Sequence, residues 1–353
     1  MKKRISILIV LCLGASMSFV GCKMTGEITP TSTVQTGLVT EEDTTTTTEQ
    51  QIEQQETVFV YVGNGNADGF LVETEPVGEV TGETVFQALQ KQGVIAETVQ
   101  YQSFQQEEDN GTSLLKLDLS KEFQEEMSKM GTAGEYLTIQ GIANTYLTAF
   151  HGDSIQITAD GNTIETGHTI YKEPLQLDIS MPDHMEAMTS IFDSLMRCIM
   201  ENQTEYNPED DAFYWNAIYY AVGAYGDLHG LCEVKDNELS APKQVVAEYA
   251  TALFYDFRDL PDIPEQNKNN IRYVDEEENY YFTLGDIGLS NTRIIQCEAG
   301  EEEGTYVIYA QLYDVVDKET IGTYRFVVRP NAYVDGITDP VFYYSVDSVE
   351  KIK

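Results

Sequence analysis

One short segment combines residue types and a spacing that could bind calcium. Asn64, Asn66, Asp68 and Glu75 match positions 1, 3, 5 and 12 of an EF-hand loop, with Gly69 at the glycine position, and oxygens at this spacing converge on Ca²⁺. Extended segments rather than helices flank the loop, however, and an asparagine replaces the charged first ligand. We therefore interpret it as a hairpin loop whose Asn, Asp and Gly residues adopt positive φ, and regard the four side chains as weak calcium candidates.

A second cluster could perform acid–base or nucleophilic chemistry. Asp227, His229 and Cys232 follow a predicted helix closely, and an imidazole beside a carboxylate and a thiol can transfer protons or activate the sulfur. A loop at the end of the helix is the favoured interpretation. The chain has 4 histidines and contains no HExxH, GxSxG or P-loop motif. The sequence therefore predicts no catalytic residue, no metal site and no cofactor, and indicates a protein that is not an enzyme.

Pairs of adjacent tyrosines could stack on sugar rings, because aromatic faces bind the C–H groups of a saccharide. The pairs are Tyr219-Tyr220, Tyr280-Tyr281 and Tyr343-Tyr344. Packing inside the protein is the favoured interpretation of all three, so the residues that bind a ligand stay unassigned.

The spacing of apolar residues in the first half predicts a small α/β unit with the order ββαββαββ. Its clearest helix follows a capping-box pattern at Thr132 to Glu135 and carries Ile142 and Tyr146 on its apolar stripe. We expect this stripe to pack on the sheet. The other expected elements are strands at 58–62, 70–74, 115–119, 155–159 and 163–165, and a helix at 84–92 that stops at a glycine.

Several of these segments together resemble the GerMN domain, also called the germane domain, of bacterial sporulation and germination lipoproteins. The resemblance rests on the strand and loop 58–69, on Leu115 to Phe123 with its Ser-Lys-Glu-Phe turn, on the helix from Gly131 through Asn144-Thr145, and on the strand 155–161. It implies a small envelope domain with an assembly or wall-associated role and no known catalytic site. It covers residues 57–172.

The second half, 183–353, has the pattern of an α+β domain in which three helices precede an antiparallel curved sheet. The first helix carries an apolar stripe, the second is expected to begin at a cap formed by Asn207, and the third is expected to open at Ser240 and Pro242. The predicted strands of one continuous meander are 280–284, 293–297, 305–313, 323–329 and 341–346. This order of elements is similar to that of cone-shaped NTF2-like domains.

The N-terminus has the pattern of a bacterial lipoprotein signal peptide over residues 1–21. Lys2, Lys3 and Arg4 precede an apolar run that is too short for a stable membrane span, and the run ends in a sequence resembling a lipobox, with Cys22 as the lipidated residue. Several acyl chains of the palmitate type would anchor the protein stably. Residues 22–56, rich in Thr, Glu and Gln, then form a disordered tether.

Composition limits the partners of the exported chain. With 21 Lys and Arg against 59 Asp and Glu, the net charge of −38 disfavours binding to nucleic acid or to an anionic lipid surface. Three cysteines, Cys198, Cys232 and Cys297, remain after the lipid site and do not suggest a disulfide framework; their redox state stays open. We expect a lipid-anchored, extracytoplasmic protein that binds an envelope protein or peptidoglycan, or alternatively a small ligand in a pocket of the C-terminal domain.

Overall fold

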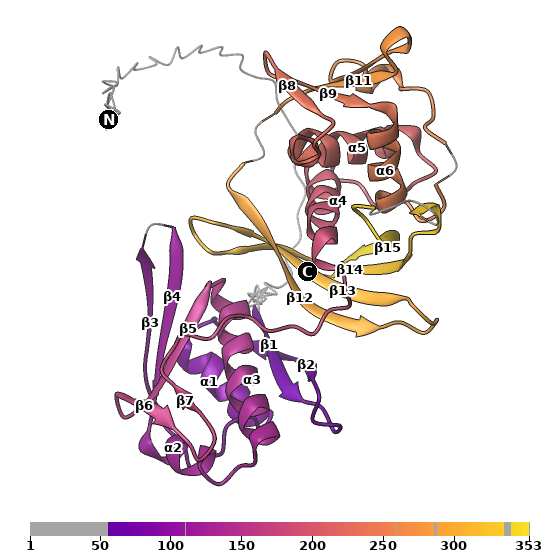
Figure 1. The fold of residues 1–353 in the computed structure, drawn as a ribbon. Coiled ribbons are helices and arrows are strands. Elements are labelled where there is room, and N and C mark those ends of the chain that lie inside the picture. Colours follow the sequence, from indigo (N-terminus) through magenta and orange to yellow (C-terminus); the bar gives the residue numbers. More distant parts are fainter. Residues whose placement is uncertain (1–55, 110, 258, 286–287, 335–339, 353) are drawn as a thin grey trace, which may run out of the picture. The chain divides into compact units, whose positions relative to one another are not determined.

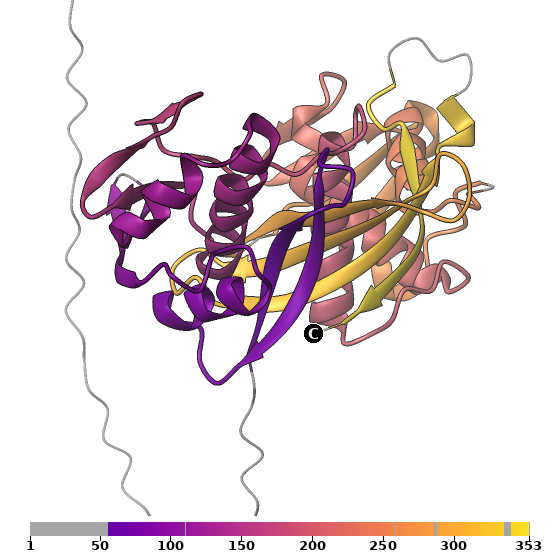
Figure 2. The same cartoon turned by 90° about the horizontal axis from the view of Figure 1, so that it is seen from below.

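A computed structural model describes residues 56–109, 111–257, 259–285, 288–334 and 340–352 (Figures 1 and 2). The chain has an α+β fold, as predicted, with helices and several mainly antiparallel sheets. The predicted signal peptide, Cys22 and the tether up to residue 55 lie outside the described residues.

The first part of the chain largely confirms the predicted order of elements. A two-stranded hairpin, β1–β2, is followed by a five-stranded sheet in the order β3-β4-β5-β6-β7, in which β4 and β5 run parallel. The elements are β1 Glu56–Gly63, β2 Phe70–Val77, α1 Gly82–Lys91, β3 Tyr101–Asp109, β4 Thr112–Leu119, α2 Lys121–Met127, α3 Thr132–Phe150, β5 Ser154–Ala159, β6 Asn162–Glu165 and β7 Ile170–Tyr171. The short helix α2 and the strand β7 were not expected.

The starts of two helices correct the sequence analysis. Gly131, not Thr132, is the N-cap of α3, and no side chain caps this end, so the predicted capping box is wrong. The Glu135 carboxylate instead accepts hydrogen bonds from the hydroxyls of Thr166 (2.7 Å) and Tyr171 (2.9 Å). The Ser-Lys-Glu-Phe segment is the first turn of α2 rather than a free turn, because Ser120 is the N-cap of that helix.

The core of this part is built as expected around α3. Ile142 and Tyr146 are fully buried, in one apolar cluster with Leu117 and Ile157 of the sheet. The Tyr146 hydroxyl donates to the Gly82 carbonyl (2.7 Å), which satisfies its polar end inside the core. The apolar stripe read from the sequence therefore identifies the buried face correctly.

Among its described residues, the second part contains three α-helices and two four-stranded sheets, in the orders β10-β11-β9-β8 and β12-β13-β14-β15. The strands of the second sheet are long and curved (Figure 2). The elements are α4 Thr189–Asn202, α5 Asp211–Tyr225, β8 Glu233–Lys235, β9 Glu238–Pro242, α6 Lys243–Leu253, β10 Ile271–Val274, β11 Asn279–Thr283, β12 Ser290–Ala299, β13 Tyr306–Asp314, β14 Thr320–Pro330 and β15 Tyr344–Lys351.

The prediction of one continuous meander is wrong. The strand β11 pairs with β9 and β10, not with β12, so the expected sheet is divided in two. Ser240 lies inside β9 and does not open α6, whereas Pro242 ends β9 and is also the N-cap of α6. Helices and strands consequently alternate between α5 and β11, and the predicted sequence of three helices before any strand is not observed.

The helix α5 begins at a different cap from the one expected. Asp210 is the N-cap, and its side chain accepts a hydrogen bond from the Ala212 backbone N–H (2.9 Å). Asn207 lies in the turn before the helix, where its carbonyl accepts from the Asp210 N–H (3.2 Å). Asn and Asp cap helices equally well, so residue type alone does not indicate which of the two is the N-cap.

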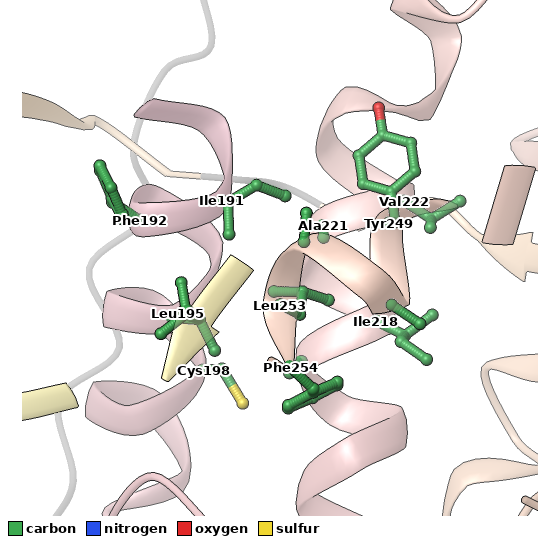
Figure 3. Close-up of a cluster of buried hydrophobic side chains, with 14 of the residues drawn as sticks. Ile191, Phe192, Leu195, Cys198, Ile218, Ala221, Val222, Tyr249, Leu253 and Phe254 are labelled. Carbon is green, nitrogen blue, oxygen red and sulfur yellow. The ribbon is translucent and has the colours of Figure 1, made fainter. Parts of the chain in front are cut away.

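The three helices share one apolar core. Ile191, Leu195 and Cys198 of α4 lie on the side that faces α5 and α6 (Figure 3), whereas the Phe192 ring packs on that of Phe326 in β14, with 4.6 Å between ring centroids. The predicted apolar stripe of Met185, Met188, Phe192, Leu195 and Ile199 is buried in this cluster, although Met185 and Met188 lie before the start of α4. Cys198 behaves as a small apolar side chain, and burial raises the pKa of its thiol to about 12.

Candidate functional site

The four calcium candidates do not converge in the structure. Asn64 Nδ2 donates to Asp68 Oδ1 (2.8 Å), and the Asp68 backbone N–H donates to Asn64 Oδ1 (3.2 Å), so these two residues close the β1–β2 loop. Glu75 pairs across the hairpin with Val58, about 17 Å beyond the Gly63–Phe70 pair at the loop. The described residues contain no group of three or more His, Cys, Asp or Glu side chains suited to a metal ion.

The conformation of this loop also differs in detail from the prediction. Ala67, with φ 58°, has the positive φ that we expected for Asn, Asp or Gly. Glu75 is buried and accepts hydrogen bonds from the side chains of Lys91 and Gln92. Glu75 therefore joins β2 to the end of α1, and its carboxylate is not directed to the loop.

In the second predicted cluster, the His229 ring contacts a residue from outside the cluster. His229 Nε2 lies 3.2 Å from Glu248 Oε2 of α6, a partner that the sequence analysis missed. The Glu248 Oε1 atom accepts from the Val341 backbone N–H (2.9 Å). Burial, and then the charge of Asp227, raise the pKa of the Cys232 thiol to about 11, so the thiol is protonated at neutral pH. A protonated thiol is a poor nucleophile. Glu248 joins α6 to the loop after α5 through His229, and to the segment before β15 through Val341.

The three tyrosine pairs have different surroundings. Tyr219 donates its hydroxyl to the Thr283 carbonyl (2.9 Å) and Tyr220 donates to Glu201 (2.6 Å), so the first pair serves packing. Tyr280 is buried in the core, as the favoured interpretation required. Tyr343 and Tyr344, in contrast, both line a surface pocket.

A cavity of about 740 Å³ brings together five segments of the chain. They are the start of β1, the segment before α1, the strand β3, the end of α3, and the β13–β14 hairpin. We call it the acidic cavity. Its lining residues are Glu56, Thr57, Phe59, Glu79, Val80, Gln106, Thr148, Ala149, Phe150, Gln311, Asp317, Lys318, Glu319 and Thr320.

The polar groups of the acidic cavity are mostly hydrogen-bond acceptors. Four carboxylates and one ammonium line it, the latter from Lys318. Gln311 of β13 is only 4% exposed, and its Oε1 atom has no hydrogen-bond partner among the described residues. A buried amide oxygen without a partner is costly, and a ligand that donates a hydrogen bond would remove this cost. The cavity thus has the chemistry to accept a positively charged, hydrogen-bond-donating group.

Buried polar contacts position the walls of this cavity. The Tyr61 hydroxyl of β1 contacts Thr148 Oγ1 (3.0 Å) and donates to the carbonyl of Ile295 in β12. Arg293 of β12 donates to the carbonyls of Leu147 (2.6 Å) and Gly152 (2.8 Å) at the end of α3. A guanidinium at a helix C-terminus also complements the helix dipole.

His151 completes this region beside the cavity. It follows α3 in the left-handed conformation (φ 49°), stacks on Tyr313 at 4.2 Å between ring centroids, and places Nε2 3.0 Å from Thr320 Oγ1. Burial, followed by the positive charges of Arg293 and Lys318, lowers the pKa of the imidazole to about 3. The ring is therefore neutral at ordinary pH and acts as a packing group.

Comparisons with known proteins give little further information. No family model matches the chain, and no curated protein matches it. One solved structure, described as a "Putative Lipoprotein from Clostridium perfringens", aligns at 21% sequence identity over 35% of this chain and 87% of its own, with a TM-score of 0.24. A TM-score this low carries no argument about fold or function, and the resemblance to the germane domain stays a prediction.

None of the helices in the described ranges has both the length and the apolar character of a membrane span.

Cys232 and Cys297 are partly buried and, like Cys198, are free thiols in the structure. Burial is the main cause that raises the pKa of Cys297 to about 11.

Proposed function

We propose that this chain is a non-catalytic, lipid-anchored protein of the cell envelope whose germane-like domain docks on an envelope protein or on peptidoglycan. The lipobox-like sequence ending at Cys22 and the tether support the anchor. The germane resemblance supports a role in sporulation, germination or envelope assembly. The lipid is the membrane partner, and the folded part needs neither a cofactor nor nucleic acid.

The acidic cavity is the observation that supports docking. Its carboxylates and the unpartnered Gln311 oxygen suit an ammonium or guanidinium group, such as the side chain of a lysine or arginine on a partner. The net charge of −38 attracts such a partner at long range. Docking here would use both the germane-like residues and the β13–β14 hairpin.

A crosslinking experiment on the full, lipidated chain in its membrane tests this proposal. Partners captured by the native chain are compared with those captured by the double variant Asp317→Lys, Glu319→Lys, which reverses the charge at the cavity. The matched control is Glu301→Lys, Glu303→Lys, which makes the same charge change on another exposed turn. We expect loss of capture in the first variant alone. Equal capture by both variants would exclude docking at the acidic cavity.

A second candidate function is binding of a small ligand by the C-terminal domain. The observation that favours it is the pocket lined by Tyr306, Tyr343, Tyr344 and His184, which lies entirely within residues 183–353.

A further inference from the structure

A cavity of about 320 Å³ lies at one end of the β12-β13-β14-β15 sheet, where three of its strands meet. We call it the aromatic pocket. It is lined by Asp183, His184, Gly304, Tyr306, Pro330, Tyr343 and Tyr344. Tyr306 begins β13, Pro330 ends β14 and Tyr344 begins β15. Because neighbouring strands are antiparallel, the start of β13, the end of β14 and the start of β15 lie at the same end of the sheet. The register places Pro330 directly opposite Tyr344.

Contacts from the chain before α4 hold the rings of this pocket in place. His184 stacks on Tyr343 with 3.8 Å between ring centroids and 14° between ring planes. The Tyr344 hydroxyl donates to the Asp183 carbonyl (3.2 Å), and the Tyr306 and Tyr344 rings meet at 89°. His184 adopts φ 66°, a left-handed conformation that is uncommon outside glycine. These contacts fix the positions of the His184, Tyr306, Tyr343 and Tyr344 rings around the pocket.

Polar groups of the pocket are available for a ligand. Within the described part of the chain, neither the hydroxyl of Tyr306, nor that of Tyr343, nor the carboxylate of Asp183 has a hydrogen-bond partner. Both tyrosines are half-buried, whereas Asp183 and His184 are exposed. The pocket therefore offers ring surfaces together with two hydroxyls and one carboxylate that can form new hydrogen bonds.

We infer that the aromatic pocket binds a pyranose ring of a saccharide. A pyranose has C–H faces that pack on the negative face of an aromatic ring, and an edge of hydroxyls that bonds to tyrosine and aspartate oxygens. The volume lies at the lower end of the range for small-molecule pockets, about 300 to 1,000 Å³, and so suits one or two sugar rings. The inference rests on the ligand-binding candidate function and is independent of docking at the acidic cavity.

Binding is tested with the full, lipidated chain in nanodiscs, by calorimetry with soluble N-acetylglucosamine and glucose oligomers and by co-sedimentation with purified peptidoglycan. Choline is titrated in parallel, because aromatic rings beside a carboxylate can also hold an organic cation. We expect Tyr343→Ala and Tyr306→Ala each to weaken saccharide binding at least tenfold. Tyr306→Phe, which keeps the ring, should weaken it only a few-fold.

The control variant is Tyr281→Ala, which truncates a tyrosine of another pair outside the pocket and should bind as the native chain does. His184→Gly keeps a residue that tolerates positive φ and removes one ring, so reduced affinity in this variant cannot be assigned to misfolding. Binding to soluble oligomers alone would indicate a free saccharide as the ligand, whereas binding to peptidoglycan would indicate a glycan of the cell wall. Absence of saccharide binding to the native chain, equal affinity in all variants, or binding of choline alone would overturn the inference.

Docking at the acidic cavity and saccharide binding in the aromatic pocket can be refuted independently of each other. The cavity variant Asp317→Lys, Glu319→Lys should retain saccharide affinity, and Tyr343→Ala should retain the crosslinked partner. Loss of both properties in either variant would show that one surface performs both functions, which contradicts the independence of the aromatic pocket.

Discussion

The buried ion pair in α4 provides the most demanding test of how the C-terminal core is held together. Arg197 Nε donates to Asp193 Oδ2 (2.6 Å), and the two side chains are 5% and 3% exposed. The Asp193 carboxylate also accepts from the hydroxyls of Tyr225 (2.7 Å) and Thr292 (2.6 Å). Arg197 Nη2 in turn donates to the Ser290 carbonyl (2.8 Å). This network joins α4 to α5 and to β12.

We predict that Asp193→Ala lowers the free energy of unfolding by about 3 to 5 kcal/mol, because it removes the carboxylate that pairs with the buried Arg197 guanidinium at 2.6 Å. The double variant Asp193→Ala, Arg197→Met removes that charge and should lose less than the sum of the two single variants. A coupling of about 0.5 to 3 kcal/mol is typical of side chains in contact. The hydroxyls of Tyr225 and Thr292 lose an acceptor in both cases, so the double variant should not recover native stability.

Urea unfolding followed by fluorescence measures these changes directly. Trp215 is the sole tryptophan, is fully buried in α5, and belongs to the same core as α4. Its emission therefore reports on the core that contains the ion pair. A loss below about 1 kcal/mol for Asp193→Ala, or strict additivity in the double variant, would refute the argument that loss of this buried ion pair dominates the cost.

Four further predictions concern other parts of the chain. Ile142→Ala should destabilise the N-terminal core by about 2 to 5 kcal/mol, measured by circular dichroism, since it opens a cavity at a fully buried position. Asp68→Ala and chelators should change stability by less than about 0.5 kcal/mol; unfolding by chelator would instead reveal a metal site. Cys22→Ala should release the protein from the membrane with its signal uncleaved, as fractionation and mass spectrometry would show. The pKa of His151 in the folded state (about 3) lies below its ordinary value of 6.5, so the unfolded state takes up this proton at a higher pH than the folded state does. The free energy of unfolding should therefore fall as pH falls from about 6.5 to 3, and fall less in His151→Gln.

Apolar periodicity predicted the cores because burial follows from local spacing. The stripes of α3 and α4 were identified from residues three and four apart, and both are buried as expected. Helix starts were less predictable. Asn207 and Asp210 have similar capping ability, and Glu135 bonds to residues beyond position 160 instead of closing a capping box. Local sequence does not contain the distant partner that decides the outcome.

Strand pairing was predicted poorly for the same reason. The alternating segments after residue 270 were located correctly in several cases, but alternation does not state which strand lies beside which. The hairpin of β8 and β9 between α5 and α6 was not predicted. The strand β11 pairs with β9 of this hairpin and therefore does not join the predicted meander. The limits proposed for two domains, 57–172 and 183–353, stay a prediction that limited proteolysis can test.

The two candidate binding sites differ in how the sequence encodes them. Tyr343 and Tyr344 are adjacent, so part of the aromatic pocket is visible as a short motif. Gln311 and Thr148 are far apart, and nothing in the sequence indicates that they line one cavity. What brings them together is the pair of contacts made by Tyr61 and Arg293, which hold β1 and the end of α3 against β12. The shape of the acidic cavity therefore depends on residues that do not line it, whereas the aromatic pocket depends mainly on the residues that would touch its ligand.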